Sequence, residues 1–218
     1  MTKSLLVGLL IMVGTTATEP VAAEPNNRIL MIVRDDSRDQ DLMLEQEVFV
    51  MQELINKAGY AIDVATVTDQ PLIGNVTLEP NIQLTEIDFS NYDGLILPCM
   101  AAEPQKAMPE KVLPLIKRAR ELGLPIGAMR GSVRELARAG ALEGHRYSYA
   151  APVDLDDHPE FRNATFEGTG VTTDRMITTA GICPLAAKVL GGMDATNQLT
   201  NAFLETVAQH QPEQGYTN

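Results

Sequence analysis

The segment from Pro125 to Gly140 constrains the fold of this chain more than any other part of the sequence. It begins with a short apolar run, Ile126–Met129, and continues into a helical pattern that Ala139-Gly140 closes. Glycine is the usual residue just beyond the end of a helix. The segment therefore predicts a short buried strand, a sharp turn and a helix.

Strand and helix patterns alternate along the rest of the chain. Apolar runs predict buried strands at Arg28–Val33, Tyr60–Val67 and Asp93–Pro98. Helical spacing predicts helices at Leu42–Ala58, Gln105–Leu122, Pro184–Leu190 and Ala195–Gln209. Hairpins are expected within 68–92 and within 170–179, the latter turning at Thr173-Asp174. This alternation predicts an α/β fold, a mostly parallel sheet with helices on both faces.

Length and charge limit the domain count and the kinds of partner. A chain of 218 residues suits one well-buried α/β domain. The net charge of −12 argues against nucleic acid and anionic membranes as partners, because both attract basic surfaces. We therefore expect no nucleic-acid partner.

The first 23 residues have the pattern of a secretory signal peptide. Lys3 supplies a positive charge, Leu5–Val13 is apolar, and Val21-Ala22-Ala23 forms a small-residue cleavage site. The apolar run is too short to span a bilayer as a helix. We expect a signal peptide at 1–23, a linker at 24–27, one domain at 28–210 and a flexible tail at 211–218. The mature protein would then be periplasmic or secreted and would have no membrane partner.

The order of the motifs resembles that of the ThiJ/PfpI family, within the class I glutamine amidotransferase-like superfamily. The markers are the Arg28–Val33 strand, Glu47 on the first helix ahead of Ala58-Gly59, Asp93–Pro98, Ile126–Gly131 leading to Ala139–Gly144, and Arg175–Gly181. The resemblance covers roughly residues 28–207. It implies a flavodoxin-like three-layer sandwich, and it also implies a homodimer, because members of the family commonly dimerise.

The resemblance also identifies the positions of a site that lacks its nucleophile. In the family, a reactive Cys occupies the turn after the strand and a Glu on the first helix hydrogen-bonds it. The Glu position falls on Glu47, which lies twelve positions before Gly59, the spacing that the family uses. Glu45 is the competitor and would face elsewhere on a helix. The Cys position holds Arg130, which stays protonated and cannot act as a nucleophile. The remaining positions are changed as well, to Gly131, Ala150 and the pair Cys99-Met100.

The two cysteines and three histidines allow further predictions. Cys99 and Cys183 should lie near each other at the carboxyl edge of the sheet, where an oxidising compartment would favour a disulfide. Two separate buried thiols are the alternative. We expect His145, His158 and His210 to be solvated. No metal site, cofactor motif or dinucleotide-binding loop is indicated.

Three functions remain open from the sequence. The first is a binding module without Cys-dependent catalysis, a pseudoenzyme that uses Glu47, Arg130 and Cys99 to hold a small anionic ligand or a protein. The second is a divergent hydrolase or lyase related to glyoxalases, hydratases or amidases. The third is a redox protein that uses Cys99 and Cys183. The absence of the elbow nucleophile favours the first, and so argues against an enzyme.

One geometric prediction follows from placing a cation beside the family's carboxyl group. A buried Arg without a partner is costly, and a hydrogen-bonded ion pair offsets most of that cost. We therefore expect a salt bridge between Glu47 and Arg130, with the pKa of Glu47 lowered.

Overall fold

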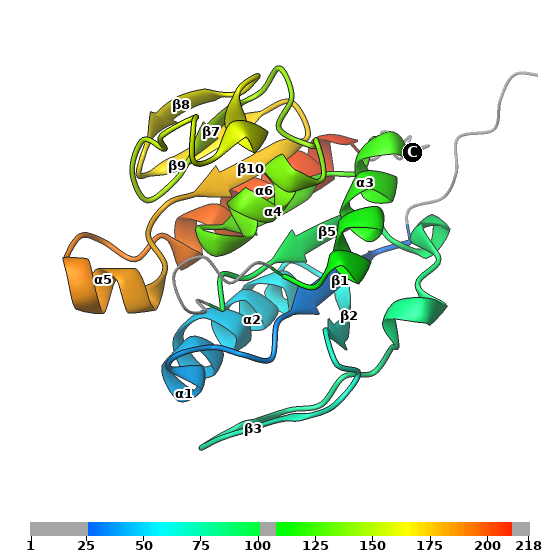
Figure 1. Cartoon of the computed structure of the whole chain (residues 1–218). Helices are drawn as coiled ribbons and strands as arrows, with labels where there is room; N and C mark the ends of the chain where they lie inside the picture. The colour runs from blue at the N-terminus through cyan, green and yellow to red at the C-terminus, as the bar shows by residue number, and fades with distance from the viewer. Residues whose placement is uncertain (1–25, 101–107, 211–218) are drawn as a thin grey trace, which may run out of the picture.

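A six-stranded sheet forms the centre of the molecule (Figure 1). The computed structural model describes residues 26–100 and 108–210. The strand order is β2 (Ala61–Thr66), β1 (Arg28–Val33), β5 (Gly94–Leu97), β6 (Ile126–Met129), β10 (Ile177–Ala180) and β9 (Val171–Asp174). The first five are parallel, and β9 runs antiparallel to β10. β5, β6 and β10 are buried along their whole length, as expected when helices cover both faces.

Helices cover the two faces of this sheet (Figure 1). The first face holds α1 (Gln40–Met43), a π-helical turn (Leu44–Val48), α2 (Phe49–Lys57) and α6 (Thr196–His210). The second face holds α3 (Leu113–Glu121) and α4 (Gly131–Arg138). Residues along β1 alternate between the two cores, with Met31 in the first and Leu30 in the second. These layers confirm the predicted flavodoxin-like three-layer sandwich.

Three predicted elements differ in their bounds. The first helix begins at Gln40 and contains the π-helical turn. The helix predicted from Gln105 is a 3₁₀ turn at Glu110–Val112 followed by α3, and its first residues, 105–107, lie outside the described part. The β9–β10 turn falls at Arg175-Met176, because Ile177 pairs with Asp174, and not at Thr173-Asp174.

Two small sheets and several short turns complete the fold. β3 (Leu72–Ile73) pairs with β4 (Thr77–Leu78), and β7 (Arg146–Ser148) pairs with β8 (Thr165–Gly168). The remaining elements are α5 (Pro184–Leu190) and 3₁₀ turns at Leu84–Glu86, Phe89–Asn91 and Pro159–Phe161.

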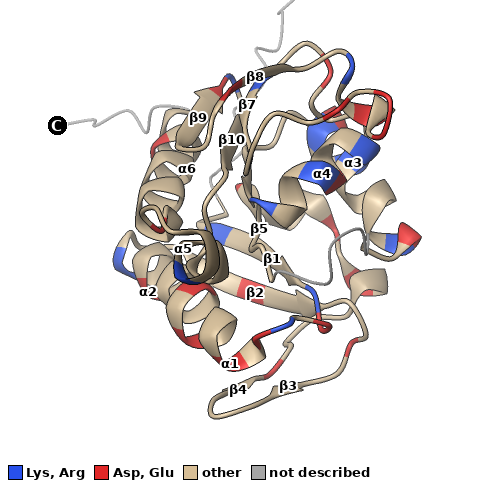
Figure 2. Cartoon of the chain, turned by 60° about the vertical axis from the view of Figure 1, so that its left-hand side comes forward, with Lys and Arg blue, Asp and Glu red and all other residues tan. Residues whose placement is uncertain are grey.

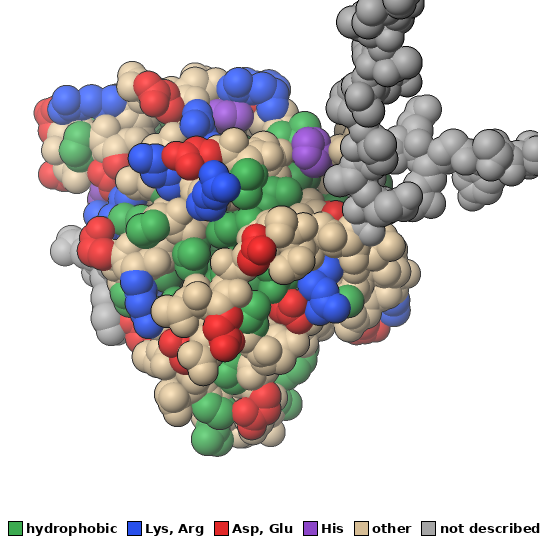
Figure 3. Space-filling view, turned by 90° about the vertical axis from the view of Figure 1, so that its right-hand side faces the viewer, with side chains coloured by type: hydrophobic (Ala, Val, Ile, Leu, Met, Phe, Trp, Pro, Cys, Tyr) green, Lys and Arg blue, Asp and Glu red, His purple; other side chains and the backbone are tan. Residues whose placement is uncertain are grey.

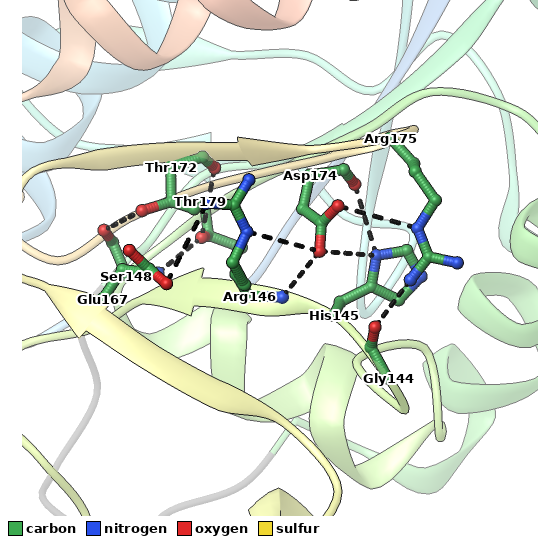
Figure 4. Close-up of polar contacts among 9 residues, drawn as sticks. All are labelled: Gly144, His145, Arg146, Ser148, Glu167, Thr172, Asp174, Arg175 and Thr179. Atoms are coloured by element: carbon green, nitrogen blue, oxygen red, sulfur yellow. Dashed lines mark hydrogen bonds and ion pairs between the residues drawn. The ribbon is translucent and has the colours of Figure 1, made fainter.

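Both outer strands of the central sheet have neighbours. At β2, the Val64 N–H donates to Asn81 Oδ1 at 2.6 Å, and the Asn81 N–H donates to the Val64 carbonyl at 3.0 Å. At the other side, β7 packs against β9 and β10. The Ser148 hydroxyl is 2.7 Å from that of Thr172, and the Ser148 N–H donates to Thr179 Oγ1 at 2.8 Å (Figure 4).

Two glycines let α6 approach the sheet closely. A Cβ on Gly94 would lie 2.8 Å from the ring of Phe203, and one on Gly127 would lie 3.1 Å from it. Phe203 is fully buried there. Any side chain at either glycine would therefore push this helix outward.

The ends of the chain and the surface give further context. The predicted signal peptide and tail lie outside the described residues. Asn26, within the predicted linker, already bonds to the fold, since its amide donates to the Ser90 carbonyl at 2.8 Å. Charged residues lie mostly on helices and loops (Figure 2), and the face seen in Figure 3 mixes acidic, basic and hydrophobic side chains. Within the described ranges, each helix is too short or too polar to cross a bilayer.

Candidate functional site

Arg130 occupies the sharp turn between β6 and α4. Its backbone angles are φ 38° and ψ −98°, which a residue with a side chain rarely adopts. Its N–H donates to the Ala180 carbonyl at 2.6 Å, which ties the turn to β10. On the opposite side, the Ser132 hydroxyl donates to the Pro98 carbonyl at 2.6 Å. The predicted sharp turn between strand and helix is therefore confirmed, and Arg130 occupies it in a strained conformation.

Glu47 projects into this site from the π-helical turn. Its side chain is fully buried, whereas Glu45 is exposed, which agrees with the choice between the two made from the sequence. The carboxyl group accepts the Cys99 N–H at 2.9 Å and the Met100 N–H at 3.4 Å. Burial, then the nearby Cys183, raise the pKa of Glu47 well above its ordinary value. These conditions favour the uncharged acid.

The predicted salt bridge between Glu47 and Arg130 is wrong. Among residues 26–100 and 108–210, no ion pair within 4.0 Å involves either side chain, and the pKa of Glu47 is raised where we expected it to be lowered. The physical reason is that the carboxyl group already has two backbone donors beyond β5. The Arg130 guanidinium lies instead beside β10, and its Nη1 donates to the Gly181 carbonyl at 3.4 Å.

The loop after β5 forms a second strained wall of the site. Met100 has a positive φ of 36° and is fully buried. In the resembled family this loop carries a Gly-Gly pair, which would adopt such angles without strain. Gly131 faces the same loop, because a Cβ placed on it would lie 3.5 Å from the Cys99 carbonyl oxygen and 3.7 Å from Cys99 Sγ.

Cys99 and Cys183 come together here, as predicted. Cys99 follows β5 and Cys183 directly precedes α5; both are buried, and both thiols are free. A hydrogen bond from Cys99, the Ala186 N–H and the charge of Arg130 together lower the pKa of Cys183 to about 7. Burial, then the interaction with Cys183, raise the pKa of Cys99. The pair thus combines an acidic thiol with a weakly acidic one.

Tyr149, which the sequence did not single out, lies close enough to this site for its charges to act on the phenol group. Burial raises the pKa of Tyr149, and the charges of Arg130 and Arg134 oppose that rise. Ala150, at the family's later His position, follows Tyr149 and brings no polar side chain. The structure thus gathers Glu47, Cys99, Met100, Arg130 and Gly131, and adds Cys183, Tyr149 and the Gly181 carbonyl.

A separate polar cluster lies around Asp174 (Figure 4). Its carboxylate accepts the Arg146 N–H at 2.8 Å and lies 3.8 Å from His145 Nδ1. His145 is only 7% exposed, so the prediction that it is solvated is wrong. It is buried because it packs under the β9–β10 turn, where its Nδ1 lies 3.2 Å from the Asp174 carbonyl oxygen. Of the other two histidines, His158 is half-buried and His210 is exposed.

A surface cavity of about 510 Å³ lies where the segment after β10 meets the end of α5 and the start of α6. Uncharged residues line it, among them Gly170, Ile182, Met193 and Gln198. Ile182 directly precedes Cys183 in the chain. In the described part of the chain, no three His, Cys, Asp or Glu residues gather in a way that could hold a metal ion.

Comparisons with known proteins agree with this fold. The model of the DJ-1/PfpI family matches residues 27–188. A ThiJ/PfpI domain protein from Brachyspira murdochii superposes with a TM-score of 0.64 at 17% identity, covering 85% of this chain and 99% of its own. A DJ-1 superfamily protein from Agrobacterium tumefaciens gives 0.60 at 19% identity, with coverage of 84% and 98%. DJ-1beta from Drosophila melanogaster gives 0.55 at 16%, with coverage of 81% and 97%. No curated protein matches the chain.

Proposed function

Because the chain belongs to the DJ-1/PfpI family, we propose that it is a member without nucleophilic chemistry at the elbow, which binds a small anion there. The observation that carries this proposal is how few polar partners the Arg130 side chain has. It is half-buried and makes one long hydrogen bond, and within the described ranges no carboxylate lies within 4.0 Å of it. Arginine has five N–H donors in a planar fork that suits carboxylates and phosphates.

The electrostatics of the site support an anionic ligand. The raised pKa of Glu47 favours its uncharged form, so this carboxyl group cancels little of the charge of Arg130. The N-terminus of α4 begins at Gly131 and adds the partial positive charge of a helix end. The binding group is thus a cation at the position where the family resemblance places a thiol.

Replacing Arg130 with glutamine tests the proposal. Inorganic phosphate and oxalate serve as probes, and equilibrium dialysis of the fully reduced protein measures their binding. A hydrogen bond to a charged group contributes about 1.5–3 kcal/mol, so Arg130→Gln should weaken binding by roughly 10-fold or more.

Arg118→Gln is the matched control, because Arg118 is an exposed arginine on α3, and it removes the same charge. Binding that is equal in the Arg130 and Arg118 variants would refute an anion site at the elbow.

We also propose that the protein acts outside the cytoplasm. The support is the pattern of residues 1–23: a charged start, an apolar stretch and a small-residue cleavage site. N-terminal sequencing of the protein recovered from the periplasm or the medium should begin near Glu24. Recovery of the uncleaved chain from the cytoplasm alone would contradict export.

A further inference from the structure

The carboxyl edge of the sheet brings two cysteines from distant parts of the chain into contact. β5 and β10 both pair with β6, and Leu97 and Thr179 are both in register with Ala128. Cys99 lies two residues beyond Leu97, and Cys183 lies four residues beyond Thr179. The two thiols are close enough across the end of β6 to shift each other's pKa, that of Cys99 upward and that of Cys183 downward.

We propose that Cys99 and Cys183 form a reversible dithiol–disulfide couple, in which Cys183 attacks a small disulfide and Cys99 resolves the mixed disulfide. This goes beyond anion binding, because it is a covalent reaction of residues other than Arg130. The elbow itself contributes only charge to it.

The surroundings of Cys183 suit an attacking thiol. The N–H groups of Ala186 and Leu185, in the first turn of α5, and the Arg130 guanidinium all favour its thiolate. Thiols whose pKa lies near the ambient pH are the most effective in disulfide exchange, and the value of about 7 for Cys183 meets this condition. The raised pKa of Cys99 keeps its thiol protonated until the second step, in which it attacks the mixed disulfide.

The position of α5 is fixed by contacts outside the pair. Lys188 Nζ lies 2.9 Å from the carboxylate of Asp39, which joins α5 to the start of α1. The Ala195 N–H donates to the Ile182 carbonyl at 2.9 Å and closes the connection on the other side. Ile182, the residue before Cys183, also lines the surface cavity, so a small disulfide would approach Cys183 from this side.

The exchange balances in two steps. The Cys183 thiolate attacks one sulfur of the small disulfide; its S–S bond breaks, and one thiol leaves with the proton that Cys183 released. The Cys99 sulfur then attacks the Cys183 sulfur; the mixed disulfide breaks, and the second thiol leaves with the proton of Cys99. Two electrons pass from the protein to the small disulfide. Because both cysteines are buried, closure within the protein is favoured over a lasting adduct with a bulky group.

Glutathione redox buffers test the couple. The native protein is equilibrated across ratios of reduced to oxidised glutathione, quenched with acid and analysed by intact mass and peptide mapping. The expected product is an intramolecular Cys99–Cys183 disulfide that reverts under reducing ratios. Cys99→Ser and Cys183→Ser should each fail to form it. Two reduced thiols at every ratio, or a lasting glutathione adduct without the internal bond, would overturn the proposal.

A second measurement identifies the attacking thiol without any substitution. Iodoacetamide labelling of the reduced wild-type protein is followed by peptide mapping as a function of pH. Cys183 should be labelled half-maximally near pH 7, well below Cys99, given the contacts with Cys99, Arg130 and Glu47. Labelling of both residues in parallel would overturn the assigned roles. Iodoacetamide is uncharged, so failure of this labelling assay is distinct from failure of the anion site.

Discussion

Replacing Glu47 with glutamine tests whether the buried carboxyl group is protonated or ionised in the folded protein. Between the ordinary pKa of a glutamate and the raised pKa of Glu47, the folded state holds a proton that the unfolded state releases. Stability from this residue is therefore fully present below the unfolded value and is lost as pH rises through the folded value. The wild-type protein should lose up to about 1.4 kcal/mol per pH unit relative to Glu47→Gln in that window.

The loss of unfolding free energy on substituting Glu47 follows from the two backbone N–H groups that its carboxyl group accepts. Glutamine keeps an oxygen for the Cys99 N–H at 2.9 Å and loses only the long bond from Met100 at 3.4 Å, which costs about 1 kcal/mol. Glu47→Ala leaves both buried N–H groups without an acceptor and removes buried side-chain volume, so it should cost about 3–5 kcal/mol.

Urea unfolding followed by far-ultraviolet circular dichroism at several pH values measures both effects. Circular dichroism is the suitable signal because the chain contains no Trp. A stability difference that grows in favour of the wild type as pH rises would refute the reasoning, since it would mean that Glu47 is ionised and stabilised by a cation. Glu45→Gln, at an exposed position two residues away, is the control and should show no such slope.

Three further outcomes are expected. Burial lowers the pKa of His145, so the protein should lose stability as pH falls below about 6.5, and His145→Gln should flatten the pH dependence of the urea midpoint; an unchanged profile contradicts this. Gly181→Ala places a Cβ 2.3 Å from a backbone carbonyl oxygen and should cost at least about 2 kcal/mol in urea unfolding, whereas Gly170→Ala, with open space around it, should cost little; equal losses would contradict this. Oxidation removes the Cys183 thiolate beside Arg130, so phosphate should bind several-fold more tightly to the oxidised than to the reduced protein in dialysis; equal or weaker binding contradicts this.

The layers of the fold and the turn at Arg130 could be predicted because short stretches of sequence indicate them. Apolar runs between helical patterns identify buried strands, and Gly140 closes the helix after the elbow at a positive φ of 72°. Glu47 could be chosen over Glu45 because the resembled family's spacing to Gly59 points to Glu47, and residues two apart do not share a helix face. The π-helical turn that carries Glu47 was not predicted, because such turns are rare and the helical spacing of apolar residues does not indicate them.

The partners of the site residues could not be predicted because they depend on distances between side chains. The sequence places a cation and a carboxyl group at one edge, but it does not show that the N–H groups of Cys99 and Met100 already occupy the carboxyl oxygens. The close approach of Phe203 to Gly94 was hidden for the same reason, since each residue alone is ordinary. The burial of His145 likewise depends on a turn that the sequence placed two residues too early.

The two hydrogen bonds between Asn81 and Val64 bear on how this protein resists aggregation. A β-sheet border with unpaired amides is a template on which another chain can add a strand and start a fibril. Here the segment after the β3–β4 hairpin meets a donor and an acceptor of β2, and the β7–β8 ribbon packs against β9. A parallel sheet assembles slowly from distant segments, so its borders are exposed to other chains until their neighbours have docked. The Asn81 segment and the β7–β8 ribbon therefore protect the two borders of the sheet against strand addition.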